Sequence, residues 1–233
     1  APPGKYRSFV FSPFSEVHLR AVTEQENPSK QQQDACLTSL PFYATDGINE
    51  TGLAIAVAGA PVQQAANPDS LPPMFVLYFI RHALDHYSTV EQVAECAGTV
   101  SLYDRAIDVI SHHIMAVDAD GNWLVIDYPK GSLRLQRGRG GVQVRTNHFP
   151  DGGPALKEAP TSFQRYQNLS GALAGSDRLD SALQAMNCLS RVRNGTAWSV
   201  VFESELKSVL LAVDEDYKKL FRFGFQSDKA IRM

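Results

Sequence analysis

Two histidines at a helical spacing are the first residues of this sequence that could support chemistry. His82 and His86 are four positions apart, so on a helix they share one face, and this spacing can bind zinc. A metalloprotease-type site also needs a glutamate directly after the first histidine and a third ligand, whereas Ala83 stands at that position. We therefore expect a helix surface here and no metal site.

The neighbouring histidines His112 and His113 also fail to predict a metal site. They lie in a segment whose alternation of apolar and polar residues is typical of a strand. Adjacent residues of a strand point to opposite faces, so both side chains cannot line one site from a single strand.

The three cysteines, Cys36, Cys96 and Cys188, are far apart and form no Cys-x-x-Cys pair. This pattern predicts neither a zinc knuckle nor a disulfide framework, and we expect a reducing, cytoplasmic location. A nucleophilic Cys36 would need a neighbouring base or cation, but the nearby Asp34 is acidic. A structural or incidental cysteine is the favoured interpretation.

A glycine- and arginine-rich segment, residues 137–141, could cradle a phosphate. It stands between two predicted strands, so no helix N-terminus is available to bind the anion. We expect a hairpin turn with solvated arginines instead.

Composition limits the classes of partner. The chain has 233 residues, 25 acidic and 22 basic side chains and 44% hydrophobic residues, with no block of like charge. This predicts one domain over residues 1–233 with a sizeable core, and it argues against a nucleic-acid or polybasic membrane surface. The longest apolar run, residues 74–80, is far shorter than the roughly 20 residues of a spanning helix. We expect no membrane partner.

Hydrophobic periodicity predicts an α+β domain. In chain order we expect an extended segment over 6–22, an exposed loop over 24–34, a tight reversal over 46–52 and a buried strand over 52–60. Two helices follow, over 71–86 and from a capping box at Ser88 and Glu91 to Gly98. The remaining elements are strands over 113–117, 123–128, 133–135 and 142–145, helices over 162–169 and 178–189, and strands over 199–202, 208–213 and 220–225.

Four segments resemble one known family. Residues 46–54 read Asp-Gly-Ile-Asn-Glu-Thr-Gly-Leu-Ala, residues 145–149 Arg-Thr-Asn-His-Phe, residues 162–166 Ser-Phe-Gln-Arg-Tyr and residues 196–201 Thr-Ala-Trp-Ser-Val-Val. In this order they resemble the choloylglycine hydrolase family, the linear-amide C–N hydrolases of the N-terminal-nucleophile class. The second segment is similar to the isopenicillin N acyltransferase branch.

The resemblance implies a four-layer αββα sandwich of mainly antiparallel sheets and a catalytic mechanism. In the family an N-terminal cysteine attacks the amide carbonyl, and its own α-amino group accepts the thiol proton. By motif position, Asn147 takes the oxyanion-hole role and Arg165 orders charge near the nucleophile. The position of a second oxyanion residue, often asparagine in the family, falls near Gly59, and a glycine can donate only its backbone N–H. From the residues alone, Asn147 is a strand-end turn residue and Arg165 a helix-surface charge.

The family opens with a Cys-Thr or Cys-Ser strand and a Gly-Arg-Asn-x-Asp turn, and the sequence contains neither. We expect this hairpin and its nucleophile in a segment of roughly 20–30 residues ahead of Ala1. The alternative is a catalytically inactive relative that binds an acyl amide without cleaving it. The resemblance further implies a small-molecule acyl amide as substrate, no cofactor and a homo-oligomer as a candidate assembly.

Overall fold

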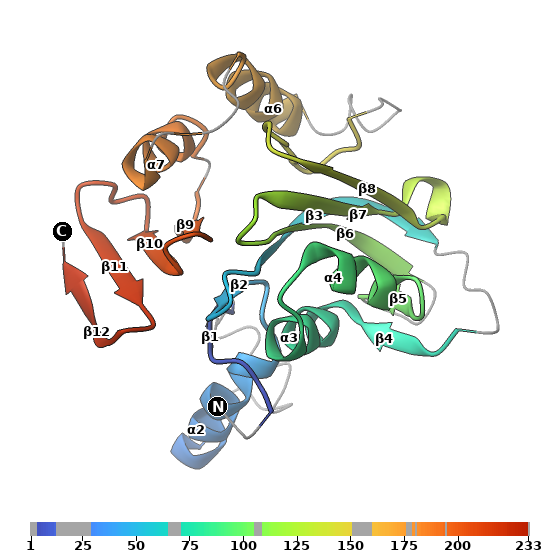
Figure 1. The fold of residues 1–233 in the computed structure, drawn as a ribbon, viewed down its shortest axis with the longest axis horizontal. Coiled ribbons are helices and arrows are strands. Elements are labelled where there is room, and N and C mark those ends of the chain that lie inside the picture. Colours follow the sequence, from blue (N-terminus) through green and yellow to red (C-terminus); the bar gives the residue numbers. More distant parts are fainter. Residues whose placement is uncertain are drawn as a thin grey trace.

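The structure is a computed structural model that describes residues 4–12, 29–64, 71–104, 109–150, 160–175, 179, 181–193 and 195–232. Two antiparallel sheets form its centre (Figure 1). The larger sheet has the strand order β1 (Ser8–Phe11), β2 (Asp46–Asn49), β3 (Ala54–Gln64), β6 (Val109–Val117), β7 (Asn122–Asp127) and β8 (Arg134–Arg139). The smaller sheet has the order β12 (Ser227–Arg232), β11 (Leu220–Gly224), β10 (Ser208–Val213) and β9 (Trp198–Glu203).

Five α-helices of the described residues lie around these sheets. They are α2 (Lys30–Ser39), α3 (Val76–His86), α4 (Val90–Ala97), α6 (Pro160–Ala172) and α7 (Ala182–Ser190), with short 3-10 turns at Leu40–Phe42 and Pro129–Gly131. The short strand β4 (Pro73–Phe75) precedes α3, and the short strand β5 (Ser101–Tyr103) follows α4. These two strands pair in parallel. Among the described residues, no helix is both long enough and apolar enough to cross a membrane.

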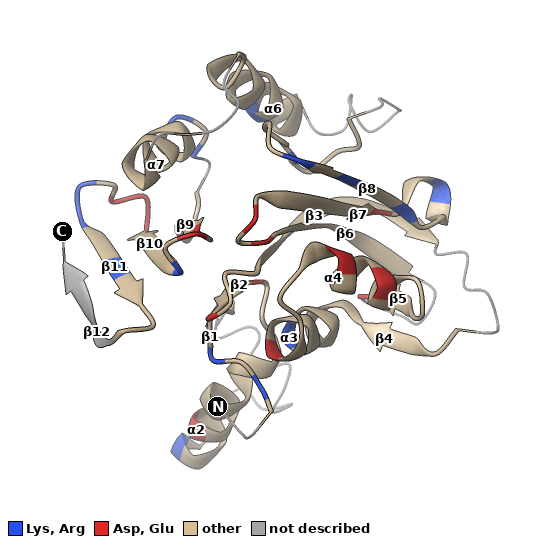
Figure 2. Cartoon of the chain, viewed as in Figure 1, with Lys and Arg blue, Asp and Glu red and all other residues tan. Residues whose placement is uncertain are grey.

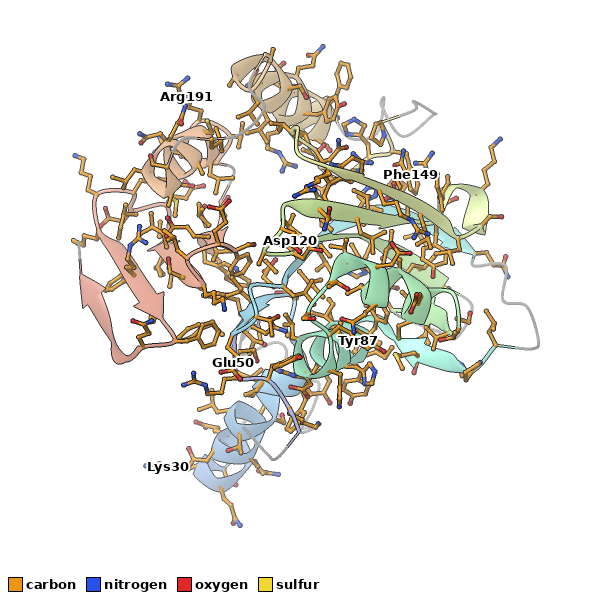
Figure 3. All side chains as sticks on the ribbon, viewed as in Figure 1. Lys30, Glu50, Tyr87, Asp120, Phe149 and Arg191 are labelled. Atoms are coloured by element: carbon orange, nitrogen blue, oxygen red, sulfur yellow. The ribbon has the colours of Figure 1, made fainter. Side chains whose placement is uncertain are left out.

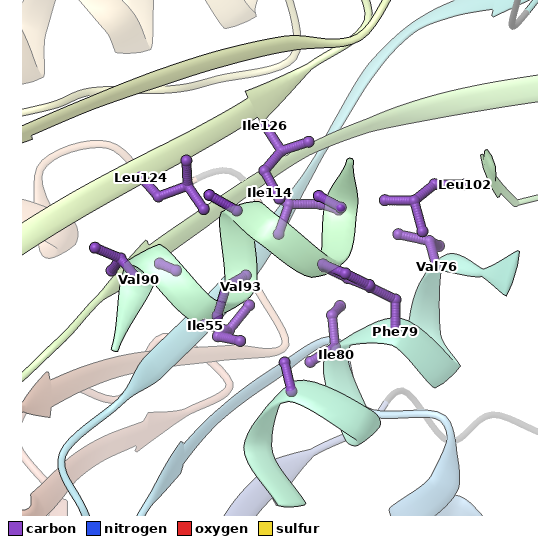
Figure 4. Close-up of a cluster of buried hydrophobic side chains, with 14 of the residues drawn as sticks. Ile55, Val76, Phe79, Ile80, Val90, Val93, Leu102, Ile114, Leu124 and Ile126 are labelled. Carbon is purple, nitrogen blue, oxygen red and sulfur yellow. The ribbon is translucent and has the colours of Figure 1, made fainter. Parts of the chain in front are cut away.

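One face of the larger sheet packs against α3 and α4. Leu53 and Ile55 of the β2–β3 region point to this face and lie in one buried cluster with Phe79 and Val93 of the helices. Figure 4 shows Ile114, Leu124 and Ile126 of β6 and β7 in the same cluster. These side chains alternate along their strands, which is the pattern of a sheet that buries alternate residues on one face.

The opposite face of the larger sheet packs against the smaller sheet. Ile48 and Ala54 form a second buried cluster with Val209 of β10. Aromatic rings fill the space around it, and the ring centroids of Phe9 and Phe225 are 4.6 Å apart. The outer face of the smaller sheet is covered by α7, since Leu210 of β10 packs in a third cluster with helix residues such as Met186. The layers therefore run helix, sheet, sheet, helix, and the predicted α+β sandwich is confirmed.

The predicted loop over 24–34 is wrong in its described part, where α2 begins at Lys30. Ser29 caps this helix: its hydroxyl accepts a hydrogen bond from the Gln32 N–H, and the Gln32 side chain accepts one from the Ser29 N–H. The capping box starts a helix even though the segment is polar, because it satisfies backbone donors at the helix N-terminus. Residues 24–28 and most of the extended segment predicted over 6–22 lie outside the described residues.

The two predicted helices over 71–98 exist, but their starts are displaced. Helix α3 begins at Val76, because Pro73–Phe75 pair with β5 as a strand. The capping box that opens α4 consists of Thr89 and Gln92, one position beyond the predicted pair. Pairing with the distant strand β5 decides where α3 begins, and local hydrogen bonding decides where α4 begins.

The hairpin predicted around residues 137–141 is wrong. Strand β8 pairs with β7 as far as Arg139, and residues 142–145 form no strand. Gly138 allows this pairing, since a Cβ atom there would lie only 2.6 Å from the Trp123 ring. Figure 2 shows basic residues along β8, and two of them are paired, Arg134 with Asp127 and Arg137 with Glu91. The hairpin over β6 and β7 is confirmed, and β12 is an additional strand.

The Asn49 side chain connects the β2–β3 turn to the end of α3 by hydrogen bonds. Its side chain is fully buried, and its Nδ2 donates to the carbonyls of Leu84 (3.0 Å) and Tyr87 (2.8 Å). Its Oδ1 accepts from the backbone N–H groups of Thr51 and Leu53, both at 3.1 Å. One side chain therefore satisfies backbone groups of a turn and of a helix C-terminus, where water has little access.

We predict that Asn49→Ala lowers the free energy of unfolding by about 3–5 kcal/mol, because several buried backbone groups lose their partner at about 1–3 kcal/mol each. Urea denaturation measures the change. Asn187→Ala, at an exposed position on α7, is the matched control and should change stability by less than about 0.5 kcal/mol. An equal effect of the two substitutions would contradict the role of Asn49.

Candidate functional site

The three residues that the sequence predicts for the site lie in one hydrogen-bonded chain. Asn147, in the turn that follows β8, donates from Nδ2 to the carbonyl of Gly59 in β3 at 3.0 Å. Arg165 of α6 donates from Nη2 to Asn147 Oδ1 at 2.7 Å. Gly59 lies 88 positions before Asn147 in the sequence and Arg165 lies 18 positions after it, so three separate segments meet at the Asn147 carboxamide. The geometry brings the predicted residues together, and their catalytic roles stay a prediction.

Gly59 lies close to the Asn147 amide. A Cβ atom at position 59 would lie 3.1 Å from Asn147 Nδ2, which is closer than most Cβ contacts. A larger residue at position 59 would therefore require the Asn147 amide to shift by a few tenths of an ångström.

The turn that carries Asn147 is fixed to α6 by a buried histidine, which sequence reasoning missed. His148 Nδ1 lies 2.9 Å from the hydroxyl of Ser162 and 3.1 Å from that of Thr146. The ring also makes edge contacts with Phe163 and Tyr166. Burial lowers the pKa of His148, and the nearby charges of His113 and Arg165 lower it further, so the imidazole is neutral at pH 7.

This arrangement explains the three-residue spacing between Ser162 and Arg165. In residues 162–166, Ser162 bonds His148 while Arg165 bonds Asn147, and the two residues are almost one helical turn apart. One face of α6 therefore contacts two adjacent residues of the turn. The signal available in the sequence was the Ser-x-x-Arg spacing itself, because it predicts two side chains on one helix face.

A buried ion-pair network supports the other side of the turn. Asp127, at the end of β7, is fully buried and lies 2.5 Å from Nδ1 of His113 and 3.2 Å from Nη2 of Arg134. Arg145, just before the turn, lies 3.7 Å from the same carboxylate. The His113 ring packs edge-on against Phe149, which is labelled in Figure 3, with ring centroids 5.1 Å apart. Both ends of residues 145–149 are thus anchored to the larger sheet.

The charge on Asp127 is stabilised by its partners. Burial alone would raise the pKa of this carboxyl, but the hydrogen bond and charge of His113, with the positive charges of Arg145 and Arg134, bring the pKa below its usual value. The group is therefore ionised at neutral pH. Its partner His113 lies on the opposite face of β6 from His112, as the strand alternation predicts.

Asp46, at the start of β2, is another carboxyl with a shifted pKa, and its residue is partly buried. Its Oδ2 accepts from the Thr45 hydroxyl (3.0 Å) and from Nε1 of Trp198 in the smaller sheet (3.4 Å). Burial raises its pKa from 3.8 to about 6, and these hydrogen bonds offset only part of the effect. The carboxyl therefore links the two sheets next to Thr45, which lines a cavity of about 390 Å³ beside Gly59.

The other sequence candidates lie elsewhere. His82 and His86 stack on α3 with ring centroids 4.4 Å apart, and His82 Nε2 lies 3.2 Å from the Tyr87 hydroxyl. In the described part of the chain, no group of three His, Cys, Asp or Glu side chains is arranged to hold a metal ion. Cys36 is buried in α2, and its thiol is free.

Comparison with known proteins identifies the family. Residues 11–206 match the model of the acyl-coenzyme A:6-aminopenicillanic acid acyl-transferases. The chain belongs to this family. The match includes all four sequence segments that predicted it, and it confirms the resemblance to the penicillin acyltransferase branch of the N-terminal-nucleophile enzymes.

Two solved structures are similar to most of the chain. Penicillin V acylase from Agrobacterium tumefaciens is 17% identical with a TM-score of 0.49, over 83% of this chain and 67% of that one. A variant of conjugated bile acid hydrolase from Clostridium perfringens is 18% identical with a TM-score of 0.49, over 82% of this chain and 72% of that one. No curated protein matches the chain. The family assignment rests on the sequence match.

We predict that Ser162→Ala lowers the free energy of unfolding by about 1–2 kcal/mol, because the buried His148 loses a hydrogen-bond partner. Ser170→Ala on the same helix is the control, since the described hydrogen bonds do not include its hydroxyl. Denaturant unfolding of the two variants provides the comparison. A loss in Ser170→Ala as large as that in Ser162→Ala would show that α6 is simply sensitive to any substitution.

The raised pKa of Asp46 predicts a pH-dependent stability difference. Because the folded pKa is about 6 and the usual value is 3.8, the carboxyl favours folding at low pH, and this contribution disappears as the pH rises through 6. Asp46→Asn removes the titration. The unfolding free energy of the variant relative to the parent should therefore increase by about 1–3 kcal/mol between pH 3.8 and pH 7. A flat difference for Asp46→Asn would contradict the prediction.

Proposed function

We propose that this chain contributes the substrate cleft and oxyanion site of an enzyme that cleaves a linear amide by hydrolysis or by acyl transfer. The observation that carries the proposal is the hydrogen-bonded chain from Gly59 through Asn147 to Arg165. Membership in an acyl-transferase family supports it. The proposed substrate is a small acyl amide bound in the cavity beside Gly59.

The Asn147 amide has the hydrogen-bonding capacity for an oxyanion donor. A carboxamide nitrogen carries two N–H groups, and one of them donates to the Gly59 carbonyl. The second can donate to the oxygen of a tetrahedral intermediate. Arg165 donates to Oδ1 of the same amide, which polarises the group and strengthens its N–H donors. The arginine also fixes which way the amide faces.

The nucleophile in this proposal is an N-terminal cysteine in a segment ahead of Ala1. The α-amino group takes the thiol proton, and the thiolate attacks the amide carbonyl carbon. Collapse of the tetrahedral intermediate breaks the C–N bond, the leaving amine takes up the proton, and a thioester remains. Water then gives the acid, or a second amine takes the acyl group. Asn147 acts in both steps because each passes through an oxyanion.

A catalytically inactive acyl-amide-binding protein is the second candidate. It needs no nucleophile, and the three cysteines of the chain, on α2, α4 and α7, take no part in the Asn147 hydrogen bonds. The two candidates share the cleft and differ in turnover.

The coding sequence upstream of Ala1 provides the first test, because the proposal requires a Cys-Thr or Cys-Ser start. The chain with that segment is then assayed for release of a fluorescent amine from a set of linear acyl amides, before and after alkylation with iodoacetamide. We expect turnover that alkylation of the N-terminal cysteine abolishes. Binding of the amides without turnover would favour the second candidate, and labelling of Cys36 as the reactive thiol would contradict both the mechanism and the site.

We predict that Asn147→Ala in the active enzyme lowers kcat by about 10²–10³-fold, the usual effect of losing one oxyanion donor. The melting temperature should change little, since Asn147 is exposed. Asn168→Ala, exposed on α6, is the matched control and should retain full kcat. Retained activity in Asn147→Ala would remove this residue from the reaction.

A further inference from the structure

The cavity beside Gly59 contains a histidine whose imidazole is accessible. His112 of β6 lines this cavity, and 27% of its side chain is exposed. Among the described residues, the buried polar atoms without a hydrogen-bond partner include Nε2 of His113 but not Nε2 of His112. The described hydrogen bond of the His112 ring uses its other nitrogen, Nδ1. The Nε2 atom of His112 is therefore open to solvent.

A buried aspartate fixes the orientation and the tautomer of this ring. His112 Nδ1 lies 2.8 Å from Oδ2 of Asp104, whose side chain is 3% exposed. The same oxygen accepts from the backbone N–H of Ser111, so Nδ1 is the donor in its contact with the ring. A neutral imidazole with its proton on Nδ1 has a lone pair on Nε2. The accessible nitrogen is thus a proton acceptor held in place by an aspartate, as general bases of hydrolytic enzymes often are.

The strand register places His112 next to the proposed oxyanion donor. His112 is directly opposite Gly59 in the antiparallel pair of β3 and β6. Such residues project from the same face of a sheet, with Cβ atoms about 4.5–5.5 Å apart. A Cβ atom at Gly59 would lie 3.1 Å from Asn147 Nδ2. The His112 side chain therefore begins within about 9 Å of the Asn147 amide. This separation suits a carbonyl group at Asn147 and a water molecule at His112 Nε2.

A purely structural role explains only part of this arrangement. Asp104 already binds β6 through the backbone N–H and the hydroxyl of Ser111, so its attachment to this strand does not require an imidazole. The next residue shows what a structural histidine looks like in this sheet, since His113 is fully buried against Asp127. His112 differs because its ring meets a cavity.

We propose that His112 is the general base of the second step, in which water releases the acyl group from the enzyme. Its Nε2 takes a proton from the water while the water oxygen bonds to the thioester carbonyl carbon, and Asn147 donates to the oxyanion. Collapse of the intermediate breaks the C–S bond, and the proton moves from Nε2 to the cysteine sulfur. The acid leaves and the thiol is restored. Asp104 is a positioning residue that keeps the proton on Nδ1. This inference rests on the proposed function, which supplies the thioester.

Labelling of the 233-residue chain with diethyl pyrocarbonate tests the accessible nitrogen without any need for activity. The reagent modifies unprotonated imidazole nitrogens that it can reach, and peptide mass spectrometry distinguishes neighbouring histidines. We expect His112 to be modified like the exposed His86, and the fully buried His113 to stay unmodified in the folded chain. An unmodified His112 would overturn the inference.

Burst kinetics of the chain with its nucleophile segment test the catalytic role. His112→Asn retains a donor to Asp104, because the carboxamide nitrogen takes the place of Nδ1, and it removes the base. We expect rapid release of one equivalent of amine, followed by turnover about 10²–10⁴-fold slower than in the unaltered enzyme. Intact mass should show the trapped acyl group, and hydroxylamine, which attacks thioesters without a base, should restore turnover. His86→Asn, exposed on α3, is the matched control and should keep full turnover.

The outcomes separate this inference from the proposed function. Undiminished turnover in His112→Asn, or a loss of amine release already in the first turnover, would overturn the role of His112 and leave the amide-cleaving function in place. No amine release by the unaltered enzyme would refute the proposed function, and the inference would fail with it. The same measurements on His112→Gln decide the question if His112→Asn does not fold.

Discussion

The larger sheet is buried on both faces, and this constraint fixes the position of every other element. Ile55 points to the helices α3 and α4, whereas its neighbour Ala54 points to the smaller sheet. A shift of one residue in the strand register would exchange these faces and place each side chain in the wrong layer. The aromatic residues of β1 and β11 fill the space between the sheets, and α7 closes the outer face of the second sheet. The four layers follow from the need to cover each apolar surface in turn.

The candidate site lies where a turn crosses this layered core. Residues 145–149 are held on one side by the buried Asp127 carboxylate and its partners, and on the other side by the neutral His148 against α6. These polar contacts restrict the segment, because a shift in its position would take the buried Asp127 and His148 away from their hydrogen-bond partners. The exposed Asn147 amide is therefore oriented by buried neighbours on both sides of it in sequence. The same polar contacts that stabilise the fold also position the proposed oxyanion donor.

The proposed function places an acyl amide in the cavity beside Gly59, whose lining includes the ring of Phe75. The Asn147 amide, which donates to the Gly59 carbonyl, is the proposed donor to the acyl oxygen.

The sequence by itself determined the local elements and the family. Strict alternation predicted the β6–β7 hairpin, helical periodicity predicted α6 and α7, and four short segments identified the acyl-transferase relationship, because each of these signals depends on nearby residues. Only the tertiary structure decided the partners. Pro73–Phe75 became a strand because β5 lies beside it, β8 extended through its glycine because Trp123 lies against it, and Asn147 gained its partners from β3 and α6. Local patterns do not record these contacts, since each joins residues of different elements that meet only when the sheets and helices pack.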